Sequence, residues 1–349
     1  MISVNNEIES TLKSGVREGY FTDYFVELGS LNDNTVFYRC GDDSVIFDLA
    51  SLTKALVLSP LVFTECKARN ISLHTPIGQF IKFPVRVLSM NRLDNITFFD
   101  LLSHSSGLGA WTNFWANRLI PEANSANLFR SRHLQIEEVL SRRDLFQNKY
   151  SELYSDIGFI LLGYIFENLV SDSLENYFYK CLDGSLSSKM GGPRFLQRAS
   201  KENIASTGYC PIRDRIITGE VHDENCAALG GFSGHAGLFS SGEGLSQFFR
   251  CISPLPNWRM FLEENFKQQE LHSKSGLLGL RRGDDESSQC FGNGSSIGHL
   301  GFTGTAFWID MKRDTYAIFL TNRVVSGRRS AEIKMIRRSI FSYLNSIKI

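Results

Sequence analysis

The sequence has no excess of either charge sign, because its 349 residues contain 37 Lys and Arg and 37 Asp and Glu. A chain without net charge builds no long-range field that would concentrate it on phosphate backbones or anionic lipid. We therefore expect no nucleic-acid partner. With a hydrophobic content of 42%, the chain can bury a large core, and its length suggests about two domains or one elaborate one.

Long apolar runs are also missing. The longest apolar stretch, 157–166, is too short to cross a bilayer, which needs roughly 20 residues. The segment 1–30 carries charges throughout and has no apolar stretch followed by a small-residue cleavage site, so it does not read as a secretory signal. From these absences we expect no membrane span and a cytoplasmic location.

Cysteine is sparse and follows no pattern. The seven cysteines form no C-x-x-C pair, and their odd number argues against a disulfide framework or a zinc knuckle. They are Cys40, Cys66, Cys181, Cys210, Cys226, Cys251 and Cys290. Such cysteines are usually small buried hydrophobes, and a reducing compartment suits them. We expect no metal and no cofactor.

The chain contains no repeat, low-complexity tract or Pro-rich linker, so its organisation has to be inferred from local patterns. Short apolar runs separated by turn-forming Asn, Asp and Gly predict an antiparallel meander near the N-terminus, and strand patterns return after residue 230. The predicted strands are 24–28, 35–38, 45–47, 237–239, 305–310 and 316–321. The loop 311–315 has a length suited to a hairpin.

Helical patterns fill the middle of the chain and its C-terminal end. The segment 52–66 predicts a helix in which Pro60 removes one backbone donor and introduces a kink. The segment 157–169 predicts a strongly apolar helix, 136–143 a shorter amphipathic one, and 330–344 a C-terminal one.

Strands at both ends with helices between them predict an α/β (α+β) fold, with an antiparallel sheet flanked by helices and a mainly helical part. We expect one sheet domain built from both termini, residues 1–50 and 225–349. The helical domain would be 51–224, with an active site at the junction of the two.

The tetrad Ser-Leu-Thr-Lys at 51–54 carries the first chemical signal. Residues three apart share one face of a helix, so the Lys54 amine can approach the Ser51 hydroxyl. A hydroxyl is a weak nucleophile until a base takes its proton, and a partly buried lysine loses its charge more easily. Alone the tetrad is weak, because Ser-x-x-Lys is common by chance and a serine at a helix start is often only an N-cap.

Three further segments accompany this tetrad along the chain. The four segments are 47–54, 99–108 with Ser-His-Ser-Ser-Gly, 154–163 with Tyr-Ser-Asp, and 299–304 with His-Leu-Gly. Together they resemble the motifs of the β-lactamase-related serine hydrolases, which include penicillin-binding proteins, class C β-lactamases and esterases. The resemblance implies the β-lactamase/transpeptidase-like fold.

The resemblance also gives roles to the matching residues. Tyr154 would shuttle protons with Lys54, protonating the leaving group and then activating the water that ends the cycle. Asp156, which stands where many relatives have Asn, would hold Lys54 and substrate amide groups. The oxyanion hole would consist of the backbone N–H groups of Ser51 and Phe302.

The last motif departs from the β-lactamase pattern Lys-Thr-Gly. In relatives selective for a substrate carboxylate, Lys and Thr donate to it, whereas His299 and Leu300 supply one titratable ring and an apolar chain. We therefore expect weak carboxylate capture, which disfavours β-lactam hydrolysis and a strict D,D-carboxypeptidase role. His299 and Gly301 are nevertheless counted as substrate-binding candidates.

The segments 219–225 and 230–240 are similar to a branch of the family that acts on cell-wall peptides and muropeptides. This branch includes a weak D,D-carboxypeptidase and an N-acetylmuramyl-L-alanine amidase. His222, Asp223 and His235 could form a substrate shelf, ligate a metal, or join loops by hydrogen bonds. Of these, we predict substrate binding for His222 and His235.

Two other segments that could supply a nucleophile are rejected. The segment Gly-Phe-Ser-Gly-His at 231–235 has histidine where a nucleophile elbow requires glycine. Ser105 and Ser106 follow His104 directly, and adjacent residues seldom achieve attack geometry.

The sequence therefore predicts a serine hydrolase that works through an acyl-enzyme, an amidase or peptidase on peptidoglycan-derived peptides or muropeptides. Its partner would be a small-molecule or peptide substrate, such as a cell-wall fragment. Two alternatives remain, a small-ester hydrolase and a non-catalytic, penicillin-binding-like sensor. The joint presence of Ser51, Lys54 and Tyr154 favours an enzyme, because a pure binder does not need the tyrosine.

Overall fold

The computed structural model covers the whole 349-residue chain. The residues that it describes are 2–81, 93, 95–114, 132–138, 145, 153–182, 192–195, 203–252, 255–271, 277–283, 291–327 and 331–349. The statements that follow concern these residues.

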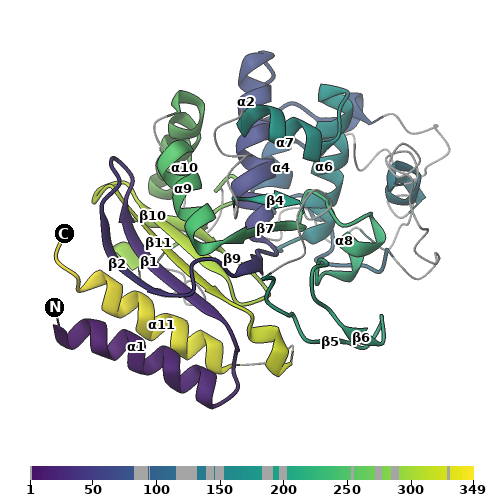
Figure 1. Cartoon of the computed structure of the whole chain (residues 1–349). Helices are drawn as coiled ribbons and strands as arrows, with labels where there is room; N and C mark the ends of the chain where they lie inside the picture. Colours follow the sequence, from purple (N-terminus) through teal and green to yellow (C-terminus); the bar gives the residue numbers. More distant parts are fainter. Residues whose placement is uncertain are drawn as a thin grey trace.

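A six-stranded antiparallel sheet with the order β2-β1-β11-β10-β9-β8 forms the centre of one half of the molecule (Figure 1). Its strands are β1 (Tyr24–Ser30), β2 (Val36–Gly41), β8 (Arg281–Arg282), β9 (Ser296–Leu300), β10 (Ala306–Asp310) and β11 (Thr315–Thr321). Because β1 pairs with β11, segments from the two ends of the chain lie side by side. The predicted hairpin between the last two strands is confirmed, with Asp310 opposite Thr315.

Side chains along the strands alternate between two cores, as the period of two in a strand requires. Trp308 and Phe319 belong to the core under the terminal helices, α1 (Ile2–Arg17) and α11 (Glu332–Asn345). Phe307 and Ile318 belong to the larger core on the opposite face. The sheet therefore lies between two layers of helices.

On the first face, α1 and α11 pack side by side although they come from opposite ends of the chain (Figure 1). On the second face, α9 (Gly242–Ile252) packs on the sheet, where Phe249 stacks on Tyr316 with 5.3 Å between the ring centroids. The remaining helices include α2 (Ser59–Ala68), α4 (Phe98–Leu102), α6 (Asp156–Val170), α7 (Leu174–Leu182), α8 (Glu224–Ala228) and α10 (Pro256–Leu271). The short helices are η1 (Lys54–Leu58), η2 (Ile77–Phe80), η5 (Phe291–Gly294) and η6 (Arg323–Ser326).

A second, three-stranded sheet has the order β3-β7-β4 and consists of β3 (Ile46–Asp48), β7 (Leu238–Ser241) and β4 (Arg194–Phe195). The predicted N-terminal meander is wrong at this point. β1 and β2 do pair, but β3 leaves the main sheet and pairs with β7. All three residues of β3 are buried, so other parts of the chain pack on both faces of this strand. The third strand of a meander with one exposed face would be covered on one face alone. A separate hairpin joins β5 (Tyr209–Cys210) to β6 (Arg215–Ile216).

The helix predicted for 52–66 runs from 52 to 68, but its first part is the π-helix η1 and its second part is α2. Pro60 lies in the first turn of α2, where the wider π-helical turn before it takes the place of the expected kink. The predicted helices 157–169 and 330–344 are confirmed as α6 and α11. Of the predicted helix 136–143, residues 136–138 are helical and the rest lie outside the described residues. The sequence patterns did not predict α1, α9 or α10.

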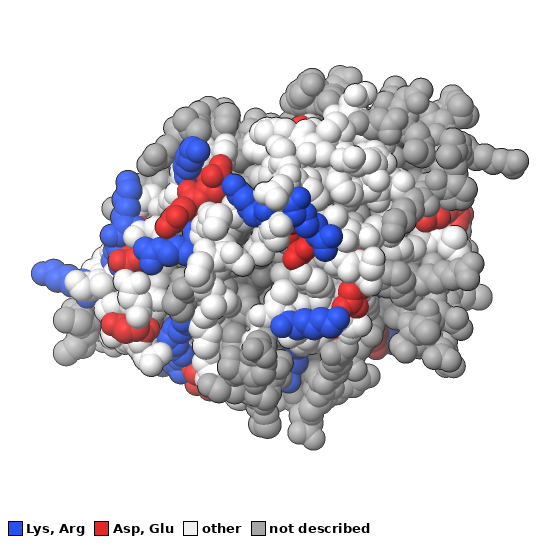
Figure 2. Space-filling view, turned by 90° about the horizontal axis from the view of Figure 1, so that it is seen from above, with Lys and Arg blue, Asp and Glu red and all other residues white. Residues whose placement is uncertain are grey.

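Six cysteines lie in the described residues, and all six are free; Cys290 lies outside the described residues. Across the described ranges, no single helix has the length and hydropathy needed to cross a membrane, and α6 with α7 passes that test only as a pair bent by 69°. On the face drawn in Figure 2, positive and negative side chains lie next to one another rather than in fields of one sign.

Candidate active site

Ser51 lies three residues after the end of β3, in a turn whose backbone is strained at Ala50. Ala50 has a φ of 47°, the left-handed region that non-glycine residues rarely adopt. The Ala50 N–H donates to Asp48 Oδ1 at 2.8 Å, and the Ala50 carbonyl accepts the Thr53 hydroxyl at 2.7 Å. These bonds fix the turn, so that the chain passes from β3 into the helix with Ser51 at the junction.

Asp48 ties this turn to two other parts of the chain. Its Oδ2 accepts the His222 N–H at 2.7 Å, and its backbone carbonyl accepts the Thr303 hydroxyl at 2.6 Å. Burial raises the pKa of the Asp48 carboxyl to about 6. Sequence reasoning missed Asp48; an acidic residue at the end of a buried apolar strand, three positions before the candidate nucleophile, was the available signal.

The structure brings Lys54 to Ser51. Lys54 Nζ lies 2.9 Å from Ser51 Oγ, and the side chain is fully buried within the π-helix η1. The same ammonium donates to the carbonyl oxygen of His235 at 3.2 Å. The one-turn spacing seen in the sequence therefore produces a direct contact between the two side chains.

Asp156 decides the charge of Lys54 in the resting site. Its Oδ1 lies 2.7 Å from Lys54 Nζ. Burial alone would lower the pKa of Lys54, but the negative charge of Asp156, assisted by Tyr154, outweighs it and raises the pKa above its ordinary value. Lys54 is therefore protonated at neutral pH and donates a hydrogen bond to Ser51.

Tyr154 stands immediately before α6 and faces the same group of side chains. Lys54 Nζ lies 4.9 Å from the centroid of the Tyr154 ring. Ser155 caps α6 by accepting the Gly158 N–H at 2.9 Å, and its own N–H donates to His104 Nδ1 at 3.0 Å. The His104 ring packs on the Tyr154 ring with 4.5 Å between centroids. His104 therefore holds Tyr154 in place in two ways, through its contact with the ring and through its hydrogen bond to the backbone of the next residue.

His104 is a neutral support rather than a second base. Burial, and then the positive charges of Lys54 and Arg281, lower its pKa to about 3. Its φ of 58° bends the backbone away from the end of α4. The histidine noted beside Ser105 in the sequence thus lies behind Tyr154.

Gly301 and Phe302 form the opposite edge of the site. The Gly301 N–H donates to the Thr305 carbonyl at 2.7 Å, and a Cβ on Gly301 would lie 2.0 Å from Thr305 Oγ1 and 2.7 Å from the Leu49 carbonyl. Only glycine lets this loop approach the turn before Ser51 so closely. Phe302 lines the pocket beside Ser51. The oxyanion hole of the Ser51 and Phe302 N–H groups stays a prediction.

His299 lies away from the space in which a substrate would bind. The ring is buried, its Nδ1 donates to the Leu300 carbonyl at 2.8 Å, and its centroid is 6.0 Å from that of Tyr154. Burial, with the positive charge of Lys54 next, lowers the pKa of His299 well below its ordinary value, so the ring is neutral. His299 is absent from the described lining of the pocket, whereas Leu300 and Gly301 are part of it.

His222, Asp223 and His235 line the pocket together. His235 Nε2 lies 2.9 Å from Asp223 Oδ1, and the charge of His235 outweighs burial and lowers the pKa of Asp223 to about 2. The His222 ring stacks on Phe302 with 5.8 Å between centroids. In the parts of the chain that the structure describes, no group of three or more His, Cys, Asp or Glu side chains is placed to hold a metal ion.

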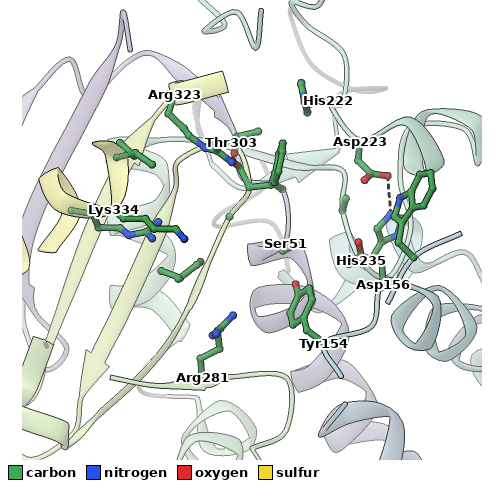
Figure 3. Close-up of a pocket in the computed structure, with 18 of the residues that line it drawn as sticks. Ser51, Tyr154, Asp156, His222, Asp223, His235, Arg281, Thr303, Arg323 and Lys334 are labelled. Atoms are coloured by element: carbon green, nitrogen blue, oxygen red, sulfur yellow. Dashed lines mark hydrogen bonds and ion pairs between the residues drawn. The ribbon is translucent and has the colours of Figure 1, made fainter. Parts of the chain in front are cut away.

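The site contains a pocket of about 600 Å³, and Ser51 and Tyr154 lie near the middle of that pocket (Figure 3). The lining residues that were not among the sequence candidates include Trp111, Arg281, Arg323, Lys334 and Arg337. They stand in segments far apart along the chain and belong to no motif. The spacing of Lys334 and Arg337 on one helical face was the one local signal.

The sequence model of one protein family, described as Beta-lactamase, matches residues 39–340. The chain belongs to the β-lactamase family. This match confirms the resemblance inferred from the four motifs, and with it the β-lactamase/transpeptidase-like fold.

The chain is also similar to individual proteins of this family. The chain is 30% identical over 253 residues to an N-acetylmuramyl-L-alanine amidase of Bacillus subtilis strain 168, covering 66% of this chain and 56% of the relative. It is 28% identical over 309 residues to a protein of Salmonella enteritidis PT4 named "Putative D-alanyl-D-alanine carboxypeptidase", covering 80% and 70%. The chain thus spans little more than half the length of the amidase.

Among solved structures, a class C β-lactamase from Rhodobacter sphaeroides superposes with a TM-score of 0.66 at 13% identity. The superposition covers 97% of this chain and 99% of that one. At such low identity, the likeness establishes the fold alone.

Proposed function

We propose that this protein is a serine hydrolase that works through an acyl-enzyme on Ser51. One observation carries the proposal: Lys54 Nζ lies 2.9 Å from Ser51 Oγ, within a pocket that Tyr154 also lines. Acyl transfer needs a nucleophile and a group that can take up and return its proton, and an amine with a neighbouring phenol can do this once the pair has lost a proton.

In the first half of the reaction, Ser51 Oγ attacks the acyl carbon and its proton passes to the Lys54–Tyr154 pair. Because Lys54 is protonated at rest, the reactive enzyme is the form in which this pair carries one proton fewer. The backbone N–H groups of Ser51 and Phe302 would bind the oxyanion. The pair then gives its proton to the leaving group as the bond to the acyl carbon breaks.

In the second half, a water molecule takes the position of the leaving group. The Lys54–Tyr154 pair accepts a proton from this water, which attacks the acyl-Ser51 carbonyl. Collapse of the second tetrahedral intermediate returns the proton to Ser51 Oγ and releases the acid.

We infer that the substrates are amides of peptidoglycan-derived peptides or muropeptides. The names of the Bacillus subtilis and Salmonella relatives support this class. So does the pocket, whose volume of about 600 Å³ lies within the range of sites for small ligands.

The test is to incubate the protein and its Ser51→Ala variant with a muropeptide digest and with 4-nitrophenyl esters, and to identify products by mass spectrometry. We expect amide cleavage by the wild type and none by the variant. Cleavage of esters alone would identify a small-ester hydrolase, and a stable acyl-enzyme without turnover would identify a sensor. Equal cleavage by both proteins would refute the role of Ser51.

A further inference from the structure

Trp111 is a large aromatic side chain that lines the pocket and stays in contact with solvent. It is 50% exposed, whereas tryptophan is highly buried on average because it removes a large apolar area from water. An exposed aromatic ring inside a concave site is typical of a surface that a ligand covers. The proposed acyl transfer gives this side chain no role.

The loop that carries Trp111 is fastened on both sides of the indole. The carbonyl of the residue before Trp111 accepts the Asp156 N–H at 2.8 Å, at the start of α6. On the other side, the Asn225 side chain in α8 donates to the Thr112 carbonyl at 2.8 Å and accepts the Phe114 N–H at 2.9 Å. The backbone is thus fixed while the indole lines the pocket, and a fixed surface loses little conformational entropy when a ligand binds.

An acceptor lies beside this loop. Asp223 lines the pocket and stands two residues before Asn225, the residue that holds the loop of Trp111. Figure 3 shows Asp223 and Asp156 on the same side of the candidate nucleophile. In the part of the chain that the structure describes, both hydrogen-bonding contacts of the Asp223 carboxylate are made by Oδ1, and 26% of the side chain is exposed. Its Oδ2 can therefore accept a hydrogen bond from a ligand, which has to be a donor.

An indole face with a carboxylate at its side matches the chemistry of a sugar ring. The face of an aromatic ring is negative and attracts C–H groups, which cover the faces of a sugar ring. The hydroxyl and amide groups of a sugar point outward from the edge of its ring, where they can donate to a carboxylate. An aromatic ligand would cover the indole but bring no donors, and an anionic group would be repelled by Asp156 and Asp223.

We propose that Trp111 is the stacking platform of a subsite for an uncharged sugar ring of the substrate, whose edge points toward Asp223. The proposal rests on the proposed function and deepens it, because it makes the substrate a muropeptide that retains its sugar rather than a sugar-free peptide. Trp111 and Ser51 line one pocket, so the sugar and the scissile amide are no farther apart than that pocket is long. An amide next to the sugar satisfies this condition better than one several residues along the peptide.

The test compares two amides that differ only in the sugar ring. N-acetylmuramyl-L-alanine carries the ring, and (R)-2-methoxypropanoyl-L-alanine has a methyl group in its place, with the same ether oxygen, acyl carbon, amide and carboxylate. The variants are Trp111→Ala and Trp111→Phe. The control is Tyr209→Ala, because Tyr209 is also an exposed aromatic residue and lies outside the described lining of the pocket.

We expect the kcat/KM of the wild type to be about tenfold or more higher for the sugar amide than for the sugar-free amide. Trp111→Ala should remove most of that preference, mainly through a higher KM for the sugar amide. Trp111→Phe should keep part of it because phenylalanine retains an aromatic face, and Tyr209→Ala should keep all of it. Since the preference is a ratio, a general loss of activity in a variant does not change it. Equal kcat/KM values for the two amides in the wild type, or a preference that survives in Trp111→Ala, would overturn the proposal.

If the wild type hydrolyses neither amide, the failure lies with the proposed function, and the subsite is tested by binding. Calorimetric titration then uses the same two compounds as ligands. Tighter binding of N-acetylmuramyl-L-alanine that is lost in Trp111→Ala supports the subsite. The absence of tighter binding, or tighter binding that Trp111→Ala retains, refutes it.

Discussion

Asp156 Oδ1 lies 2.7 Å from Lys54 Nζ, so the residue that would activate Ser51 is held in an ion pair. Asp156 raises the pKa of Lys54 despite its complete burial. In the proposed mechanism, proton transfer therefore depends on Lys54 and Tyr154 as a unit, and the charge of Asp156 sets the pH at which that unit loses a proton.

We expect Asp156→Asn to move the acid limb of the kcat/KM profile to lower pH. Removing the carboxylate withdraws the charge that holds the proton, while burial continues to disfavour the ammonium, so the pair deprotonates more easily. A shift of roughly one pH unit or more is expected. Measurement of kcat/KM from pH 5 to 10 with a neutral ester checks this.

Asp172→Asn is the matched control, since it removes a carboxylate that pairs with Lys180 outside the pocket lining. Its profile should coincide with that of the wild type. An acid limb that stays in place in Asp156→Asn would show that Asp156 does not govern the proton on the pair.

Lys54→Ala and Tyr154→Phe should each lower kcat on the order of 10³-fold or more, and the double variant should be little slower than either single one. The reason is that each residue has no function in proton transfer without the other. Single-turnover kinetics with an activated ester, combined with circular dichroism to verify folding, provide the test. Multiplicative losses in the double variant would mean that the two residues act independently.

The strain of the left-handed backbone at Ala50 should lower the free energy of unfolding of the protein. We expect Ala50→Gly to leave the free energy of unfolding unchanged or to raise it by up to about 1 kcal/mol, because glycine relieves the strain of a positive φ. Ala55→Gly, in the π-helix η1, should lower it by about 1 kcal/mol. Denaturant titration measures both, and equal losses in the two variants would contradict the strain.

The ion pair of Asp223 and His235 should contribute a pH-dependent part of the stability. The pKa of Asp223 is about 2 in the folded state, below its ordinary value of 3.8, so its contribution is complete above pH 4 and disappears as the pH falls toward 2. A shift of this size corresponds to about 2 kcal/mol. The difference in unfolding free energy between wild type and Asp223→Asn should therefore shrink between pH 4 and 2. A difference that does not change with pH would mean that charge is not its cause.

The residues around Ser51 could be predicted from the sequence because their signals are local. Ser51 and Lys54 are one helical turn apart, and Tyr154 precedes an apolar helix in a distinctive motif. The motif of His299 was equally visible, but a motif does not tell which side of a strand faces the pocket. The structure places the His299 ring with its centroid 6.0 Å from that of Tyr154 and outside the described lining of the pocket.

The rest depended on contacts between distant segments. Arg281, Arg323 and Arg337 meet only because β8, η6 and α11 converge beside the pocket. The change of sheet at β3 also escaped prediction, because an apolar run of three residues pairs equally well with either sheet. Local patterns thus predicted which serine and lysine come into contact, and the tertiary fold determines the charge around them.

Covalent labelling tests the central claim most directly. After incubation with a fluorophosphonate, mass spectrometry of the digested protein should locate one adduct, on the peptide that contains Ser51, and Ser51→Ala should carry none. A protein that hydrolyses its substrate while Ser51 stays unlabelled, or that is labelled at another residue, would contradict the account.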